Sequence, residues 1–260
     1  MTDLDLFSVA GKTALVTGGT RGIGYMIAEG LLKAGARVFI ASRKPEACAA
    51  AEQTLSEFGA VTAFPADLSS PDESADLARR VAAQTSELHV LVNNAGATWG
   101  ASFDEFPVSG WDKVLNLNLR APFVLTQQLR PLLDAASRHD DPARVLNVGS
   151  IDGLAVPNFD NFSYGAAKAG LHHLTRHMAS TLAPKILVNA IAPGPFPTKM
   201  LTGALDDDGE QLRASNPLGR IGVPDDAAAL AIFLSARGSS FITGATIPLD
   251  GGLAATAKVG

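Results

Sequence analysis

The chain has 260 residues, of which 47% are apolar, and a formal net charge of −5. This acidic balance lacks the electrostatic footprint of a nucleic-acid-binding protein, and no apolar run reaches the roughly 20 residues that span a bilayer. No signal peptide opens the chain, and we expect a cytoplasmic protein without membrane insertion or a nucleic-acid partner. Cys48 is the only cysteine and lies in an alanine-rich stretch, which predicts a small packed helix residue and no internal disulfide.

The first predicted elements are a short buried strand at 14–16, a glycine-rich turn and an apolar-periodic helix at 25–33. The turn has the spacing G-x-x-x-G-x-G from Gly18 to Gly24. Glycines let the backbone approach a pyrophosphate, and the helix N-terminus supplies unpaired N–H groups and a positive dipole end. This order favours dinucleotide binding over the alternative, an ordinary strand-to-helix turn.

The residues after the second predicted strand, 38–41, indicate which dinucleotide binds. An acidic residue here would grip a ribose 2′-hydroxyl and repel a 2′-phosphate. The chain instead has Ser42, Arg43 and Lys44, and the glycine turn adds Arg21. Because a guanidinium binds phosphate in bidentate fashion, this pattern predicts NADP(H). The alternative is that Arg43 and Lys44 are solvated charges, although the helix dipole disfavours cations at a helix start.

Further polar residues follow the next strands. Asp67 comes after the third strand, in a position that is typical of an N-cap or an Asx-turn. The run 93–96, Asn-Asn-Ala-Gly, ends the fourth strand, where ligands bind in open α/β sheets. We expect Asn93 to be partly structural. Ser150 ends the fifth strand, and alone it would indicate only a turn.

Strand-like and helical runs alternate along the whole chain, and no linker or internal repeat interrupts them. This alternation predicts an α/β fold, a parallel sheet covered by helices on both faces, in a single domain over 1–260. The irregular stretch at about 193–224, which contains an acidic run at 206–210, is typical of a functional loop. The predicted strands are 14–16, 38–41, 61–65, 90–92, 145–148, 187–191 and 246–248.

Tyr164 and Lys168 are four residues apart on a predicted helix, so they share one face. A free phenol titrates near pH ~10, and a close cation is expected to lower that pKa. Tyr164 can then exchange a proton with a substrate oxygen. His172, His173 and His177 follow on the same helix, and the last two have the i,i+4 spacing of metal ligands. Because no further ligand is apparent, we expect no metal site here. We expect the three histidines to be solvated or to lie at an interface.

Taken in order, the glycine turn, Asn93–Gly96, Ser150 and the Tyr164–Lys168 pair resemble the short-chain dehydrogenase/reductases. The resemblance covers about 6–252 and is closest to the 3-oxoacyl-(acyl-carrier-protein) reductases, and to the rhamnolipid-pathway type through 107–111 and 191–197. It implies a Rossmann fold with seven strands in the order 3-2-1-4-5-6-7, catalysis by Asn118, Ser150, Tyr164 and Lys168, a substrate-binding loop at about 193–224, and a homotetramer. In this family an asparagine carbonyl holds a water linked to the lysine. Asn116 lies beside Asn118 and is the better candidate for a helix cap.

Charge pattern and resemblance together predict NADPH-dependent reduction of a carbonyl, with a 3-oxoacyl thioester, carrier- or coenzyme A-bound, as the substrate. Other ketones, quinones, steroids and sugars stay open as substrates, and a non-catalytic NADP sensor is the alternative from another functional class. The predicted cofactor contacts are Gly18, Thr20, Arg21, Gly22, Ile23, Gly24, Ser42, Arg43, Lys44, Asp67, Leu68, Asn94, Ala95, Gly96, Tyr164, Lys168, Pro193, Gly194, Phe196 and Thr198.

Overall fold

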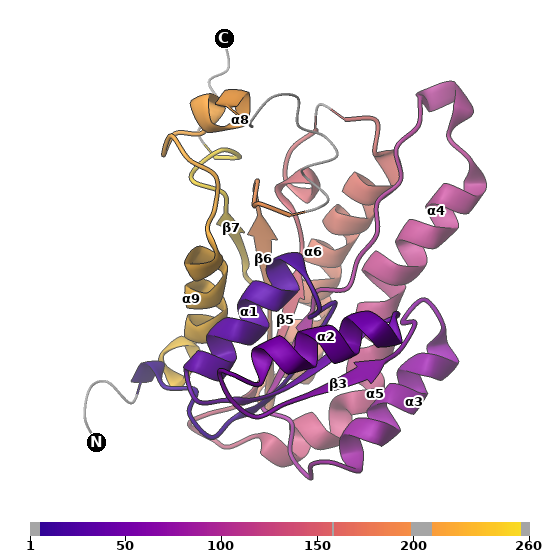
Figure 1. Ribbon diagram of the computed structural model, residues 1–260. Coiled ribbons are helices and arrows are strands. Elements are labelled where there is room, and N and C mark those ends of the chain that lie inside the picture. The colour runs from indigo at the N-terminus through magenta and orange to yellow at the C-terminus, as the bar shows by residue number, and fades with distance from the viewer. Residues whose placement is uncertain (1–5, 158, 199–209, 256–260) are drawn as a thin grey trace.

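The computed structural model describes residues 6–157, 159–198 and 210–255 of the chain (Figure 1). Within them, seven parallel strands form one sheet in the order β3-β2-β1-β4-β5-β6-β7, which confirms the predicted fold class. Each predicted strand lies inside an observed one. The strands are β1 (Thr13–Thr17), β2 (Arg37–Ser42), β3 (Val61–Pro65), β4 (Val90–Asn93), β5 (Ala143–Val148), β6 (Ile186–Pro193) and β7 (Thr246–Leu249).

The helices begin where the sequence supplies start signals. Proline occupies the first turn of α2, α3 and α9, where its missing N–H costs no hydrogen bond. The helices are α1 (Gly22–Lys33), α2 (Pro45–Leu55), α3 (Pro71–Ala82), α4 (Val108–Leu115), α5 (Ala121–Ala136), α6 (Phe162–Leu182), α8 (Glu210–Ser215) and α9 (Pro224–Ser235), with short 3-10 turns η2 (Phe103–Glu105), η4 (Ile151–Gly153) and η6 (Arg237–Ser239). None of the helices in the described ranges has both the length and the apolar character needed to cross a bilayer.

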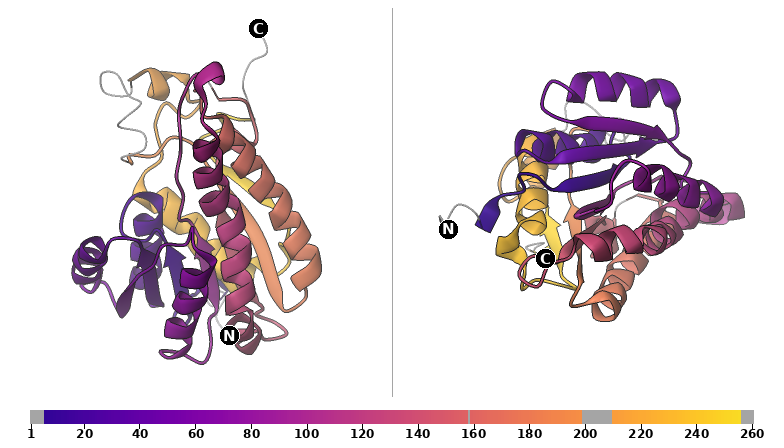
Figure 2. Two further views of the ribbon diagram at one scale, coloured as in Figure 1. Left: turned by 90° about the vertical axis from the view of Figure 1, so that its right-hand side faces the viewer. Right: turned by 90° about the horizontal axis from the view of Figure 1, so that it is seen from below.

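Helices α4 and α5 are joined by a π-helical turn, η3 (Asn116–Arg120), so the three run as one rod beside α6 (Figure 2). The sequence predicted helix here but not the wider i→i+5 hydrogen-bond register. Cys48 is buried in α2, as predicted, and burial raises the pKa of its thiol.

The two faces of the sheet carry separate apolar layers, because successive strand side chains point to opposite sides. Leu15 and Phe39 pack with α3, α5 and α6. Val16 and Ile40, their neighbours in sequence, pack with α1, α2 and α9. Since all strands are parallel, their carboxyl ends lie at one edge of this sandwich, and the glycine turn, the 93–96 run and Ser150 follow there.

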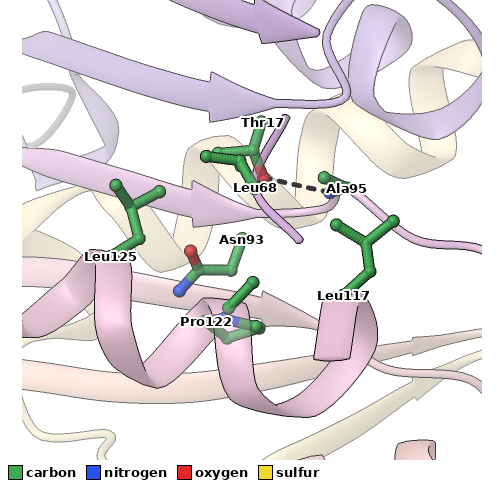
Figure 3. Close-up of a pocket in the computed structure, with 8 residues that line it drawn as sticks. Thr17, Leu68, Asn93, Ala95, Leu117, Pro122 and Leu125 are labelled. Atoms are coloured by element: carbon green, nitrogen blue, oxygen red, sulfur yellow. Dashed lines mark hydrogen bonds between the residues drawn. The ribbon is translucent and has the colours of Figure 1, made fainter. Parts of the chain in front are cut away.

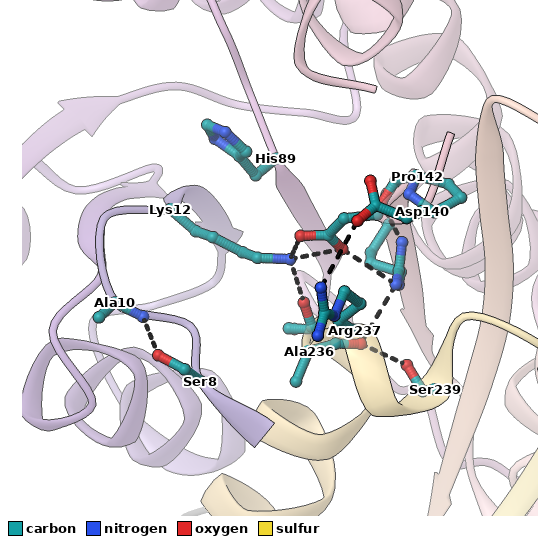
Figure 4. Close-up of polar contacts among 12 residues, drawn as sticks. Ser8, Ala10, Lys12, His89, Asp140, Pro142, Ala236, Arg237 and Ser239 are labelled. Atoms are coloured by element: carbon teal, nitrogen blue, oxygen red, sulfur yellow. Dashed lines mark hydrogen bonds and ion pairs between the residues drawn. The ribbon is translucent and has the colours of Figure 1, made fainter. Parts of the chain in front are cut away.

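A buried ion network ties the opposite edge of the sheet together (Figure 4). Lys12 Nζ lies 2.7 Å from Asp141 Oδ2 and donates a hydrogen bond to the Ser235 carbonyl at 2.9 Å. Arg144, whose side chain is fully buried, donates to Asp141 Oδ1 at 3.3 Å and to the Ala236 carbonyl at 3.1 Å. Burial lowers the pKa of Lys12, and Asp141 opposes that shift. One carboxylate therefore partners two buried cations and fastens β1 and β5 to the end of α9.

Replacing Asp141 with alanine is expected to lower the free energy of unfolding by about 3 kcal/mol, because Lys12 and Arg144 stay buried without their anion. The matched control is Asp140→Ala. Asp140 is 71% exposed and lies 3.5 Å from Arg237, so its loss is expected to cost less than about 1 kcal/mol. Thermal and urea unfolding at equal protein concentration measure both variants. Equal stabilities would contradict the structural role given to Asp141.

Candidate active site

The glycine turn between β1 and α1 forms a cradle that side chains would fill. Gly18 and Gly22 have positive φ values, +65° and +57°, which favour glycine. A Cβ on Gly24 would lie 2.6 Å from the Gly18 carbonyl oxygen and 2.3 Å from Asn94 Nδ2. Helix α1 begins at Gly22 with no side-chain cap and no acidic residue in its first turn. Its free N–H groups and its dipole therefore suit a phosphate anion, so the turn fits a dinucleotide.

The end of β4 is fastened to this turn by hydrogen bonds. Asn94 Nδ2 donates to the carbonyls of Thr17 at 2.9 Å and Gly18 at 3.3 Å. The Ala95 amide donates to Thr17 Oγ1 at 3.0 Å (Figure 3). Asn93 is buried and donates to Asn147 Oδ1 at 2.9 Å, which is the structural role expected for it. The side-chain amide of Asn94 thus holds the backbone of the glycine turn in place.

A small cavity lies beneath this junction, among Thr17, Leu68, Asn93, Ala95, Leu117, Ala121, Pro122 and Leu125 (Figure 3). Its volume is about 10 Å³, room for about one water molecule, so it cannot admit a substrate. Leu68 is buried in the core, and Asp67 Oδ1 accepts hydrogen bonds from the Ser69 amide at 3.0 Å and its hydroxyl at 2.7 Å. The Asx-turn expected at Asp67 is therefore present.

The cations after β1 and β2 lie at one edge of the site. Thr17 pairs with Ala41 in the sheet, and the Gly18 amide donates to the Ala41 carbonyl at 2.7 Å, so the two following segments are neighbours. Arg21, Arg43 and Lys44 are exposed there. None of the three forms an ion pair within the part of the chain that the structure describes. Their charges are available to an anionic group.

Ser150, Tyr164 and Lys168 converge at the end of β5. Ser150 caps η4, and its Oγ accepts a hydrogen bond from the Asp152 amide at 3.1 Å, which leaves its hydroxyl proton free to donate. The Tyr164 hydroxyl contacts the Ser150 side chain. Lys168 is buried, and its Nζ donates to the Val148 carbonyl at 2.7 Å and lies 5.5 Å from the centroid of the Tyr164 ring.

The expected lowering of the Tyr164 pKa by Lys168 is not found, and this prediction was wrong for the state described. Burial raises the pKa of Tyr164 to about 12; the Ser150 contact opposes the shift, and the charge of Asp152 adds to it. Burial also lowers the pKa of Lys168 to about 8, against the attraction of Asp152. The ammonium is directed at the Val148 carbonyl, so it does not stabilise the phenolate. Tyr164 is therefore a protonated acid at neutral pH.

Asn118 lies in the π-helical turn and is buried. Its Oδ1 accepts from the Ala97 amide and its Nδ2 donates to the Ala97 carbonyl, both at 2.8 Å. The side chain thus fixes the segment after β4, so the predicted water would have to bind the main-chain carbonyl of Asn118. Asn116 is the C-terminal cap residue of α4, as predicted, and its backbone carbonyl accepts the wide-register hydrogen bond from the Ala121 amide.

Residues after β6 approach the glycine turn from the other side. A Cβ on Gly22 would lie 3.3 Å from Thr198 Cγ2, which brings two predicted cofactor segments together. Gly194 packs against Asp250. Phe196 is only 3% exposed, and its ring covers Gly222, so its side chain belongs to the core. Residues 199–209 of the predicted substrate-binding loop, including 206–209 of the acidic run, lie outside the described residues.

The sequence analysis missed two polar residues beside the site, Asn161 and Asp152, and placed a third, His172, wrongly. Asn161 Nδ2 donates to Asp152 Oδ2 at 3.1 Å and joins the two ends of the segment between Ser150 and Tyr164. His172 is 3% exposed, so the prediction of a solvated or interface histidine was wrong for it, whereas His173 and His177 are exposed. No residue spacing indicates such contacts. Among the described residues, no group of three or more His, Cys, Asp or Glu side chains is placed to hold a metal ion.

Comparison with known proteins gives one consistent result. The family model described as enoyl-(acyl carrier protein) reductase matches residues 18–254. The chain is 48% identical over 250 residues, 95% of its length and 97% of the relative, to the rhamnolipids biosynthesis 3-oxoacyl-[acyl-carrier-protein] reductase of Pseudomonas aeruginosa. It is 36% identical over 248 residues, 93% of its length and 98% of the relative, to the acetoacetyl-CoA reductase of Allochromatium vinosum. The solved Pseudomonas aeruginosa RhlG/NADP active-site complex matches with a TM-score of 0.93 and 48% identity, over 96% of this chain and 99% of that one.

Proposed function

The chain belongs to the short-chain dehydrogenase/reductase family, and from this premise we propose that it uses NADPH to reduce the ketone of a 3-oxoacyl thioester to a 3-hydroxyacyl product. The convergence of Ser150 and Tyr164 beside the glycine turn carries the proposal, because both hydroxyls can reach one carbonyl oxygen. The two relatives named above, which act on 3-oxoacyl and acetoacetyl thioesters, support the choice of substrate.

Each residue then has a defined task. The glycine turn from Gly18 to Gly24 would hold NADPH, which would supply the hydride for the reduction. Tyr164, which is protonated at neutral pH, donates its proton to the developing alkoxide. Ser150 donates its free hydroxyl proton in a hydrogen bond to the same oxygen. The Lys168 ammonium would return a proton to Tyr164 through a water held by the main-chain carbonyl of Asn118.

The test is NADPH oxidation with acetoacetyl-coenzyme A, longer 3-oxoacyl thioesters on coenzyme A or carrier protein, and a panel of quinones, cyclic ketones and keto sugars. We expect turnover of at least one 3-oxoacyl thioester and none of crotonyl-coenzyme A, because the site is built to polarise a carbonyl. Turnover of an unrelated ketone alone would overturn the acyl assignment. Tight NADPH binding with no turnover of any substrate would favour the non-catalytic sensor.

We also propose a cytoplasmic homotetramer. The lone buried Cys48 fits a reducing compartment. Helices α5 and α6 lie at the surface, and Phe123 of α5 is 45% exposed, which suits packing against a second copy across a two-fold axis. Light scattering at micromolar concentration is expected to give the mass of a tetramer, or of a dimer if only these helices pair. A monomer would contradict the proposal.

A further inference from the structure

His172 is a buried polar residue that the mechanism above does not use. It lies on α6 one turn after Lys168 and is 3% exposed, and neither ring nitrogen forms a hydrogen bond of good geometry among the described residues, although the Gly153 carbonyl lies close enough to act on the ring electrostatically. Buried polar side chains are normally satisfied, so an exception calls for an explanation in its surroundings. The ring must contribute through its shape and position.

Two glycines surround the ring. A Cβ on Gly149 would lie 2.1 Å from His172 Nε2, and a Cβ on Gly153 would lie 2.9 Å from His172 Cε1. Gly149 directly precedes Ser150, and Gly153 is the last residue of η4, the turn that Ser150 caps. The flat five-membered ring therefore occupies the space that a side chain at Gly149 would need, and it shares the space at Gly153 with the α6 backbone at Lys168 and Ala169, so the Ser150 turn rests on this part of α6.

Lys168 supports Val148, the residue just before Gly149. Its Nζ donates to the Val148 carbonyl at 2.7 Å. Consecutive turns of α6 thus support the stretch from Val148 to Gly153 at two points, with Ser150 between them, and Tyr164 lies one turn earlier on the same helix face.

The charges near the ring favour its neutral form. Burial lowers the pKa of His172, and the charges of Lys168 and Arg176 act in the same direction, while the Gly153 carbonyl opposes them. A neutral ring avoids a second buried cation beside Lys168. The imidazole can therefore pack closely without charge repulsion at neutral pH.

We propose that His172 is a positioning residue for carbonyl reduction, which acts through Gly149 and Gly153 to fix Ser150 relative to Tyr164. The inference rests on the proposed role of Ser150. Small displacements of a reacting group are costly, so His172→Ala is expected to lower kcat by about 10- to 100-fold with little change in NADPH affinity. The matched control is His173→Ala, since His173 is exposed on the same helix and its loss should leave kcat unchanged.

A double-mutant cycle separates positioning from general destabilisation. If His172 acts through Ser150, then His172→Ala causes no further loss of kcat in the Ser150→Ala background. An equal fold loss in both backgrounds, or an unchanged kcat in the single variant, would overturn the inference. Should Ser150→Ala itself leave kcat intact, the proposed catalytic site fails instead.

A substitution at Gly149 provides a second test of the contact, which does not require the His172→Ala variant to fold by itself. Gly149→Ala places a methyl group against the ring and is expected to lower kcat. Adding His172→Ala removes the clash and should recover part of the thermal stability lost by Gly149→Ala. A fully active Gly149→Ala enzyme, or no recovery of stability in the double variant, would count against the contact.

Discussion

Tyr164→Phe is expected to lower kcat by about 10²- to 10⁴-fold, because it removes the proton donor and almost no volume. The buried ring keeps its packing, so cofactor binding and the melting temperature should change little. NADPH oxidation under substrate saturation measures kcat, and quenching of protein fluorescence measures NADPH affinity. A large loss of kcat with intact NADPH binding would assign the lost step to proton transfer.

Tyr25→Phe is the matched control, since Tyr25 is the only other tyrosine of the chain. Its hydroxyl donates to Thr54 Oγ1 at 3.1 Å on the outer surface, away from Ser150. We expect its removal to leave kcat unchanged. Retention of most activity by Tyr164→Phe would mean that another acid protonates the substrate oxygen, and the mechanism proposed for this site would be abandoned.

The sheet was predictable because its signals are local. Each strand is a short apolar run bounded by polar or glycine residues, and the alternation of such runs with helices leaves few topologies. The placement of the glycine turn, Asn93 and Ser150 at one edge also follows from parallel strands alone. The order of the strands came from the resemblance to a family, because nothing in the residues themselves specifies it.

Features that depend on tertiary contacts were not predictable. The i,i+4 spacing put Tyr164 and Lys168 on one face, but spacing could not show that the ammonium points to the Val148 carbonyl or that burial raises the phenol pKa. Phe196 looked like a loop residue able to meet substrate, yet its ring packs on Gly222, 26 positions later in the sequence. The burial of His172 could not be read from the sequence, because its neighbours are glycines of a distant turn.

Arg43→Asp is expected to shrink or reverse a preference of the unmodified protein for NADPH over NADH. If Arg43 binds the 2′-phosphate, the substitution removes a charge-assisted hydrogen bond and puts a repulsive carboxylate in its place. Such bonds contribute enough to change an affinity ratio by about 10- to 100-fold, and the new repulsion adds to the loss. Arg21→Ala should act in the same direction with a smaller effect, since it adds no negative charge.

Calorimetric titration with both cofactors at one ionic strength measures the ratio of dissociation constants, which must be compared at equal salt because exposed charges are screened. Arg79→Asp is the matched control: it makes the same change in net charge, and Arg79 is exposed on α3, where it pairs with Asp76 at 3.2 Å. That control should keep the NADPH preference. Equal affinity of the unmodified protein for NADPH and NADH, or an unchanged ratio in Arg43→Asp, would remove the cations at the end of β2 from the cofactor site.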